Sequence, residues 1–451
     1  MKETKRTLTF VGVAVVLAIL AIIAAPGHYT PEAFLDQGEP FFPDFTDPNE
    51  ATTLEVIDYD EATGSAIPFK VTFQDGIWVI PSHHDYPADA QDRLAETAAG
   101  VIGIKKDDFR TDNVSDHEMC GVIDPLDESY AGLSGRGKRV TIKGKDDNIL
   151  ADFIVGREVE GRPGFRFVRV PDQKRVYASR IDVDISTRFQ DWIDTDLLQV
   201  DKTKISGVTI NDYSINERTG TVNQKDRLQL YLDDDTWTAR NLNKMKVVDS
   251  TTMKNFLTAI DELSIVGVRP KPEGISRTLQ QVSDGQAQLS MSDMSSLQSK
   301  GFYLSRDGQL MSNEGELKVR TTEGVVYTLR FGEVLFGSGL AVSAGTEAEE
   351  QSGPAENRYL FITTEFDESA FPEPRLPSDS SFMDKPDSLK TDADRENEKM
   401  VGDHKRWYSN ITRGQRISAD LNARFADWYY VISSESFDKL NLGREDLIKD
   451  K

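Results

Sequence analysis

One stretch has the residue types of a phosphate-binding loop, GLSGRGK at residues 132–138. In nucleotide-binding loops of this spacing, the residue after the lysine is a Ser or Thr that binds Mg²⁺, and a helix follows whose N-terminus faces the phosphates. Here Arg139 takes that position, and the VTIKG after it is typical of a strand. The sequence therefore predicts a flexible loop at this position and no nucleotide site.

Histidine, cysteine and aspartate occur in small groups that resemble fragments of metal sites. His83-His84-Asp85 has no further histidine at a ligand spacing, and adjacent side chains point in different directions. His117 and Cys120 form a second incomplete pair. The run of aspartates at 233–235 lacks the spaced oxygens and the terminal Glu of a calcium loop. We expect structural or solvent-exposed roles for these groups, with no metal and no other cofactor.

Catalytic residues are equally hard to find. The chain has 76 Asp and Glu residues, so no pair stands out as a general acid and base. It has no Gly-x-Ser-x-Gly motif and no nucleophile with a base partner. We therefore predict no catalytic residue.

Aromatic residues cluster near the C-terminus, in RFADWYYVI. Alternation along a strand would bury one row of side chains and expose the other. The set is either core packing or a partner-binding surface. Its members are Phe425, Trp428, Tyr429 and Tyr430.

An internal repeat gives the chain its predicted architecture. Residues 54–78 and 208–237 both contain Asp-Tyr, then Thr-Gly, then a tryptophan after a tight acidic turn. Each copy is typical of a three-stranded antiparallel meander with a Thr-Gly turn. Trp78 and Trp237 are expected at equivalent positions in the two cores.

A helix and further strands follow each meander. The periodicity predicts helices over 87–104, with Leu94, Ala98 and Val101 on one face, and over 249–268, with a cap at Asp249 or Ser250. The second helix has an apolar stripe of Met253, Phe256, Leu257, Ile260 and Leu263. Alternating segments predict strands at 138–142, 148–155, 165–170, 175–178, 316–320, 325–331 and 359–364.

These elements predict two tandem α+β repeats, at 52–204 and 205–451, each a mainly antiparallel sheet with a packed helix. The second repeat is longer, with acidic loop insertions at about 342–357 and 368–394. A strongly charged segment at about 389–423 is typical of a solvent-exposed helix, although Gly402 and Gly414 weaken it.

The N-terminal residues predict a membrane anchor. Residues 1–7 are a basic tail, and 8–25 form an uncharged apolar run that is long enough to cross a bilayer as a helix. Basic flanks stay in the cytoplasm, so the rest of the chain would lie outside it, at the cytoplasmic (inner) membrane. A cleaved signal peptide is the alternative. Residues 26–51 are a spacer in which Phe41, Phe42 and Phe45 either fix it to the first domain or dock on another protein.

Composition excludes one class of partner. The net charge of −23 repels phosphate backbones, so we expect no nucleic-acid binding. The single Cys120 does not determine the redox compartment.

Several segments resemble a known bacterial family. FIVGREV, GFRFVRV, RVYASRID and RFQDW in the first half, and LNARFADWYYVI in the second, are similar to domain of unknown function 4340. The resemblance implies membrane-anchored envelope proteins that are associated with ABC-type transporter components. It supplies no catalytic residue.

Together these observations predict an extracytoplasmic accessory or scaffold protein without enzymatic activity. Its partners would be the membrane and an integral-membrane permease or a transporter-auxiliary subunit. A peptide- or glycan-binding module is the alternative, and a hydrolase is a third hypothesis.

Overall fold

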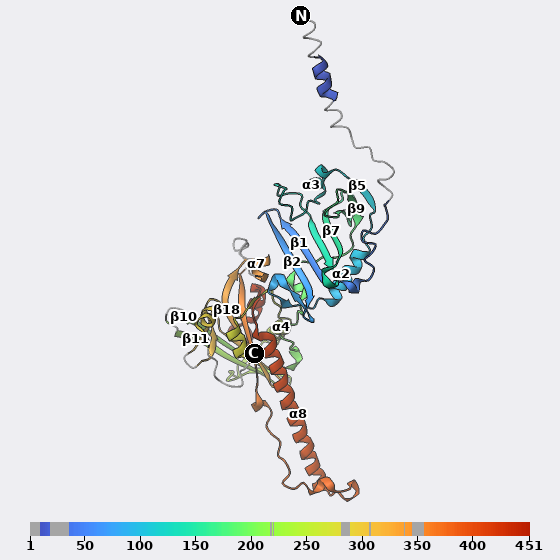
Figure 1. Cartoon of the computed structure of the whole chain (residues 1–451). Coiled ribbons are helices and arrows are strands. Elements are labelled where there is room, and N and C mark those ends of the chain that lie inside the picture. Colours follow the sequence, from blue (N-terminus) through green and yellow to red (C-terminus); the bar gives the residue numbers. More distant parts are fainter. Residues whose placement is uncertain are drawn as a thin grey trace. The chain divides into compact units, whose positions relative to one another are not determined.

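The computed structural model describes residues 10–18, 36–216, 219, 221–280, 289–305, 308–337, 339–344 and 356–451 (Figure 1). The chain forms two compact units. Unit 1 comprises Met1–Pro68 and Arg93–Ile185, and unit 2 comprises Phe69–Asp92 and Ser186–Lys451. The predicted ranges 52–204 and 205–451 therefore do not coincide with the two units, because a hairpin from the first half of the sequence is part of unit 2.

The predicted transmembrane helix at 8–25 must be corrected. Among the described residues, no helix is both long enough and apolar enough to span a membrane. Within the predicted span the structure describes a helix at residues 10–18, and the other positions lie outside the described residues. Over the described residues, the fold is a mixed α and β architecture with large antiparallel sheets.

The first sheet has nine strands in the order β4-β3-β2-β1-β6-β7-β8-β9-β5. The division between the units falls within β2, after Pro68. Positive φ at Gly64 produces the predicted turn between β1 and β2, whereas its proposed counterpart Gly220 lies outside the described residues. The strands are β1 Thr53–Asp60, β2 Ser65–Gln74, β3 Ile77–Ile80, β4 Tyr86–Pro87, β5 Asp108–Thr111, β6 Lys138–Lys143, β7 Ile149–Glu158, β8 Phe165–Arg169 and β9 Val176–Arg180.

Unit 1 has its core on the strands β1, β6 and β7, where alternate apolar side chains are buried. The helix α2 (Gln91–Ile102) buries Leu94, Ala98 and Val101, as its periodicity predicts. The described part of the spacer packs on this unit, because Phe41 and Phe45 are buried and the rings of Phe42 and Phe153 lie 5.6 Å apart. The alternative that fixes the spacer to its own domain is therefore confirmed for these residues.

Unit 2 contains an eight-stranded sheet in the order β12-β11-β10-β17-β18-β19-β20-β14. Its strands are β10 Ile205–Asn216, β11 Thr221–Asp233, β12 Thr236–Ala239, β14 Gly267–Pro270, β17 Glu316–Thr321, β18 Val325–Phe336, β19 Glu356–Phe366 and β20 Trp428–Ile432. Two small sheets pair β13 Lys246–Val248 with β21 Ile448–Asp450 and β15 Phe302–Leu304 with β16 Leu310–Ser312.

The helix α4 (Ser250–Asp261) begins where the sequence predicts it but ends before the predicted 268, and residues 267–268 belong to β14. The carboxylate of Asp249 accepts hydrogen bonds from the backbone N–H groups of Thr251 and Thr252. Met253, Phe256, Ile260 and Leu263 of the predicted stripe are buried, and Leu257 is half-buried. Trp78 and Trp237, in contrast, are only half-buried, so neither is a core residue.

The remaining helices are mostly short. They are α3 His117–Cys120, α5 Glu273–Gln280, α6 Met291–Gln298, α7 Gly339–Ala344, α8 Asp392–Ala426, α9 Ser434–Leu440 and α10 Arg444–Leu447. Short 3-10 helices are η2 Pro48–Glu50, η3 Pro81–His83, η4 Val114–Asp116, η5 Lys145–Asp147, η6 Phe189–Trp192, η7 Lys202–Lys204, η9 Glu368–Ala370, η10 Ser381–Asp384 and η11 Asp387–Leu389.

The long helix α8 corresponds to the charged helix predicted at about 389–423. A capping box between Thr391 and Asp394 begins it, because each side chain accepts a backbone hydrogen bond from the other residue. The predicted insertion at 368–394 contains η9, η10, η11 and the start of α8. Most of the other insertion, at 342–357, lies outside the described residues.

Candidate functional site

The cluster of Phe425, Trp428, Tyr429 and Tyr430 does not form the predicted partner-binding surface. Phe425, Tyr429 and Tyr430 are 0–1% exposed, and only Trp428 is half-buried. The Tyr429 ring stacks on Phe302, and its hydroxyl group lies 3.1 Å from that of Ser296. On the opposite side of the strand, the ring of Tyr430 packs edge-on against Phe425. Because β20 lies between β19 and β14 and is covered on both faces, alternation does not expose a row of rings.

A buried lysine lies beside this cluster. The Lys271 ammonium group donates to the carbonyl oxygen of Phe425 at 2.8 Å and lies 3.8 Å from the centroid of the Phe361 ring. Burial lowers the pKa of Lys271 well below its ordinary value of 10.5. The Ser276 hydroxyl group donates to the carbonyl oxygen of the next residue, Ala426. Both side chains thus satisfy carbonyl groups at the C-terminal end of α8, a structural role that no sequence pattern indicated.

The adjacent residues His83 and His84 form hydrogen bonds with the short helix α7. His83 is 1% exposed, and its ring nitrogens lie 3.0 Å from the Ser82 hydroxyl group and 2.9 Å from that of Ser343. His84 Nε2 lies 2.7 Å from the carbonyl oxygen of Ala344. Burial lowers the pKa of His83 to about 4, with smaller contributions from His84 and Arg269.

The contact between His83 and Ser343 has the residue types of a base and a nucleophile. Catalysis of that kind needs an orienting group at the other ring nitrogen and a place for substrate at the hydroxyl group. The orienting position is occupied by a neutral serine, Ser82, and Ser343 itself is 8% exposed. We therefore assign this contact to packing.

The other predicted metal-like pair is also accounted for by structural contacts. His117 Nε2 lies 2.8 Å from the carbonyl oxygen of Lys174, and burial lowers the pKa of His117. Cys120 is fully buried in a cluster with Val122, Ile154 and Val176, and burial raises the pKa of its thiol. Over the described ranges, no group of three or more His, Cys, Asp or Glu residues could hold a metal ion.

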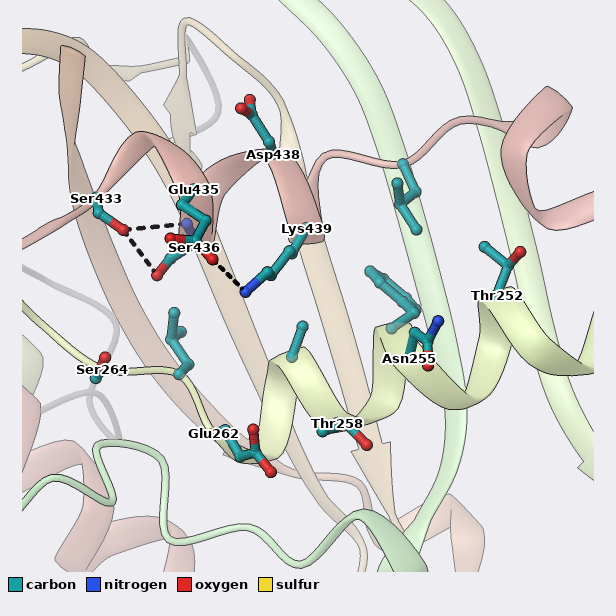
Figure 2. A pocket seen from close by; sticks show the side chains of 14 residues that line it. Thr252, Asn255, Thr258, Glu262, Ser264, Ser433, Glu435, Ser436, Asp438 and Lys439 are labelled. Carbon is teal, nitrogen blue, oxygen red and sulfur yellow. Dashed lines mark hydrogen bonds and ion pairs between the residues drawn. The ribbon is translucent and has the colours of Figure 1, made fainter. Parts of the chain in front are cut away.

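A groove of about 820 Å³ lies between α4 and α9 in unit 2 (Figure 2). Figure 2 shows polar side chains along both helices, with Lys439 paired to Glu435 at 2.7 Å. Small-molecule and peptide sites commonly have volumes of roughly 300–1,000 Å³, so the groove is large enough for such a ligand. Its lining residues include Thr252, Asn255, Phe256, Thr258, Glu262, Leu263, Ser436 and Asp438.

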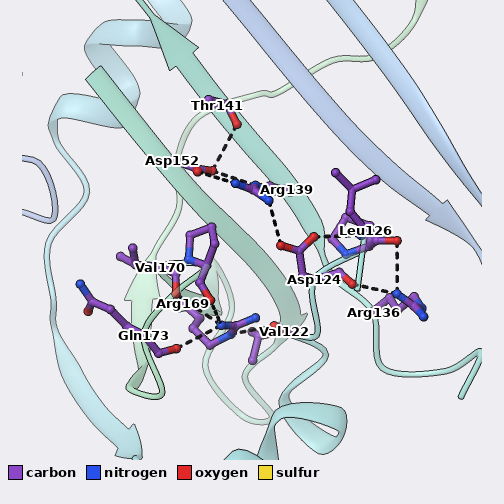
Figure 3. A network of polar contacts seen from close by, with 12 residues as sticks. Val122, Asp124, Leu126, Arg136, Arg139, Thr141, Asp152, Arg169, Val170 and Gln173 are labelled. Atoms are coloured by element: carbon purple, nitrogen blue, oxygen red, sulfur yellow. Dashed lines mark hydrogen bonds and ion pairs between the residues drawn. The ribbon is translucent and has the colours of Figure 1, made fainter. Parts of the chain in front are cut away.

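The phosphate-loop-like segment is part of an arginine network in unit 1 (Figure 3). The Arg136 guanidinium group donates to the carbonyl oxygens of Asp124, Pro125, Asp127 and Tyr130, at 2.8–3.2 Å. The segment leads into the strand β6 and not into a helix, so no helix N-terminus is available for a phosphate.

Two further arginines complete this network. Arg139 forms a bidentate ion pair with Asp152, at 2.7 and 3.0 Å, and a second ion pair with Asp124 at 2.9 Å. Arg169 donates to the carbonyl oxygens of Val122, Pro171 and Gln173. The network joins the surrounding loops through partners in the same chain, and Arg136 Nε is its one buried guanidinium nitrogen without a hydrogen-bond partner among the described residues. We therefore assign the network a structural role.

One element of unit 2 buries very little of its own surface. We call residues 367–410 the arm; it comprises η9, η10, η11, the segment between them and the first half of α8 (Figure 1). Within the arm only Phe382 and Asp394 are buried. Its large exposed apolar side chains are Leu376, Met383, Leu389 and Tyr408, with exposed fractions of 54–69%.

Comparison with known families identifies one similarity. Residues 78–302 match the family Domain of unknown function (DUF4340). The match supports the resemblance of segments such as FIVGREV and RFQDW to that family. It includes α4, Lys271 and the arginine network, whereas the arm lies outside it. No curated protein and no solved structure matches the chain.

Proposed function

We propose that this protein is an accessory or scaffold subunit without enzymatic activity, which binds a protein of an ABC-type envelope transport system through the arm. A location outside the cytoplasm and an integral-membrane permease as partner are part of this proposal. The family resemblance supports the link to transport. The observation that carries the proposal is the ordered arm, whose exposed apolar side chains have no core of their own.

Specific polar contacts hold the arm in its conformation. Lys385 forms an ion pair with Asp394 at 2.8 Å, next to the capping box of α8. The indole N–H of Trp407 donates to the carbonyl oxygen of Phe371 at 2.8 Å. This bond holds α8 against the segment of the arm that precedes it in sequence. Ordering these residues costs conformational entropy that little apolar burial within the arm offsets. We infer that the arm is retained for contact with another molecule.

The chemistry of the arm fits a protein surface. Its exposed Tyr408 and Met383 are residue types that are enriched in the buried centre of protein interfaces. Acidic and basic side chains alternate around them, among them Lys399, Asp403 and Lys405. Such a mixture suits a partner with an apolar centre and a polar rim, and it disfavours an anionic lipid surface or a nucleic acid.

A duplicated architecture is also part of the proposal. The order β3-β2-β1-β6-β7-β8-β9-β5 corresponds strand by strand to β12-β11-β10-β17-β18-β19-β20-β14. In each case a hairpin joins two strands of the meander, and the last strand in the order comes directly after the packed helix in sequence. We infer two tandem copies, of which the second has acquired the arm between β19 and β20.

The arm can be tested by crosslinking in cells followed by purification of the full chain and identification of its partners. The test variant replaces Leu376, Met383, Leu389 and Tyr408 with Asp. The matched control makes the same change at four side chains of unit 1 that are 53–59% exposed, Val114, Met119, Leu133 and Ile149.

We expect the wild type and the control to recover a transporter component, and the arm variant to recover at least about tenfold less, which corresponds to roughly 1.4 kcal/mol of binding energy. Equal thermal unfolding of the two variants would show that both are folded. Equal recovery with the arm variant, or absence of any transporter component with the wild type, would contradict the proposal.

A peptide- or glycan-binding module is the second candidate, and the groove between α4 and α9 favours it. Substituting Asn255 and Ser436 with bulky Trp would fill this groove without altering the arm. If these changes abolish binding of peptides or glycans in a ligand array, and the arm variant does not, the groove is the functional site.

A further inference from the structure

A small acidic cavity of about 260 Å³ lies within unit 2, beside Asp261 at the C-terminal end of α4. Five separate segments contribute to it: the loop that contains η7, the end of α4, the β17–β18 turn, β18 itself and α8. Its polar lining residues include Asp196, Asp201, Lys204, Asp261, Glu323 and Tyr327. The volume is below the roughly 300 Å³ at which sites for drug-sized ligands begin, so the cavity suits a single side chain or a small ion.

Three of its carboxylates already have partners. Asp261 pairs with Lys202 at 3.5 Å. Glu323 pairs with Arg413 at 2.9 Å and with Lys204 at 3.4 Å. Asp201 accepts hydrogen bonds from the backbone N–H and the hydroxyl group of Thr203. These groups are held in place by the chain itself.

Asp196 differs from the other three. Its carboxylate accepts one hydrogen bond, from the backbone N–H of Gln199 at 2.8 Å, and it has no ion-pair partner among the described residues. The nearby Arg424 instead pairs with the carboxylate of Asp194 and donates to the backbone carbonyl oxygen of Asp196. Burial raises the pKa of Asp196, and Asp194 and Asp261 add to this effect, whereas the hydrogen bond from Gln199 and the charge of Arg424 oppose it. Asp196 is thus a carboxylate of the cavity that forms no ion pair with a described residue.

Tyr327 contributes a second polar group to the cavity. Tyr327 is 3% exposed and lines the cavity, and no described residue forms a hydrogen bond with its hydroxyl group. This oxygen is not among the fully buried atoms without a partner, so it is open to the cavity. Buried tyrosine hydroxyl groups usually have a partner. Asp196 and Glu323 line the same cavity as Tyr327. Burial raises the pKa of Tyr327, and the two carboxylates raise it further. An oxygen that can accept a hydrogen bond therefore faces the same space as the unpaired carboxylate.

We propose that this cavity binds one primary ammonium group, held between the carboxylate of Asp196 and the hydroxyl oxygen of Tyr327. An ammonium group has three N–H donors and a compact positive charge, which suit these acceptors. A planar guanidinium group prefers a carboxylate with both oxygens free, and Asp196 already uses one for Gln199. A metal ion is a poorer fit, because no described set of three such ligands could hold one.

The ammonium group can come from a lysine side chain of another protein or from a free amine. Calorimetric titration of the full chain with n-butylammonium and with N-acetyl-lysine methylamide separates the two sources. Binding of both probes supports a lysine side chain, and binding of n-butylammonium alone supports a free amine. The Nε-acetylated lysine derivative is the negative control, because it lacks the charge.

Two variants test the named residues. We expect Asp196→Asn to lower the affinity for n-butylammonium roughly tenfold or more, since a charge-assisted hydrogen bond becomes a neutral one. We expect Tyr327→Phe to lower it by a smaller factor while preserving the ring packing. Asp233→Asn, on an exposed hairpin outside the cavity, should bind like the wild type.

Failure of both amines to bind the wild type would overturn the proposal, as would unchanged affinity in Asp196→Asn or tighter binding of Ca²⁺ than of n-butylammonium. Unfolding curves of the variants establish that each is folded. The cavity contains no residue of the arm, so this test and the crosslinking test can fail independently.

Discussion

Asn422 on α8 forms hydrogen bonds with both backbone polar groups of Thr364 on β19. Its side-chain oxygen accepts from the Thr364 N–H at 2.8 Å, and its side-chain nitrogen donates to the Thr364 carbonyl oxygen at 2.6 Å. The next strand, β20, pairs with β19 only between Arg358 and Leu360. Asn422 therefore takes the place of a neighbouring strand where the sheet pairing has ended, and it fixes α8 to the sheet.

Replacing Asn422 with Ala should leave both backbone groups of Thr364 without these partners. Because each unsatisfied buried group costs about 1–3 kcal/mol and this site is partly open to water, we expect the free energy of unfolding to fall by about 2 kcal/mol. Denaturant unfolding monitored by circular dichroism measures the change. Gln415→Ala, at an exposed position of the same helix, is the control and should change it by less than about 0.5 kcal/mol. An Asn422→Ala variant as stable as this control would show that the contact contributes nothing.

The two glycines of α8 predict opposite effects of the same substitution. A Cβ atom at Gly402 would meet nothing within 4 Å, whereas at Gly414 it would lie 2.2 Å from Phe366 Cε2 and 2.7 Å from the carbonyl oxygen of Glu323. Gly402→Ala should stabilise the helix by about 0.5–1 kcal/mol, because glycine is a poor helix former. Gly414→Ala should destabilise the protein by about 1–3 kcal/mol, because a packed side chain must move. Thermal unfolding together with amide hydrogen exchange along α8 compares them, and equal shifts of the same sign would be inconsistent with the packing.

Because of His83, we expect the folded protein to lose stability in mild acid. Its pKa is about 4 in the folded protein and 6.5 as the ordinary value, so between these values the unfolded chain binds more protons than the folded one. The contribution of His83 is therefore present above pH 6.5 and is lost as the pH falls toward 4, by up to about 3 kcal/mol.

Denaturant unfolding of the wild type and of His83→Gln at several pH values isolates this contribution. We expect the difference between the two free energies of unfolding to change between pH 6.5 and 4 and to stay constant above pH 7. His404→Gln, on the arm, is the control substitution. A difference that is independent of pH would mean that His83 is as accessible to protons in the folded protein as in the unfolded one.

Local features of this protein were predictable from its sequence. The cap at Asp249, the buried stripe of α4 and the range of α8 are encoded within a few residues of each other, because helices depend on near-neighbour hydrogen bonds and on a 3.6-residue period. The strands β6 to β9, β17 and β19 were predicted close to their observed bounds for the same reason, since strand alternation is a short-range pattern, whereas β18 extends beyond the predicted 331 to Phe336. The resemblance to a family that matches residues 78–302 was also visible in short segments.

Contacts between distant segments determine which side chains are buried and where cavities form. Alternation could not show that Tyr429 and Tyr430 are both buried, because the cover on the faces of β20 comes from residues such as Phe302 and from the end of α8. The sequence did not show why a glycine occupies position 414 in α8. The structure shows that a Cβ atom there would collide with the Phe366 ring on β19. The apolar run at 8–25 predicted a span that the described helix does not form. The cavity of Asp196 and Tyr327 forms because five segments that are distant in sequence come together. Local sequence patterns do not predict contacts between distant segments.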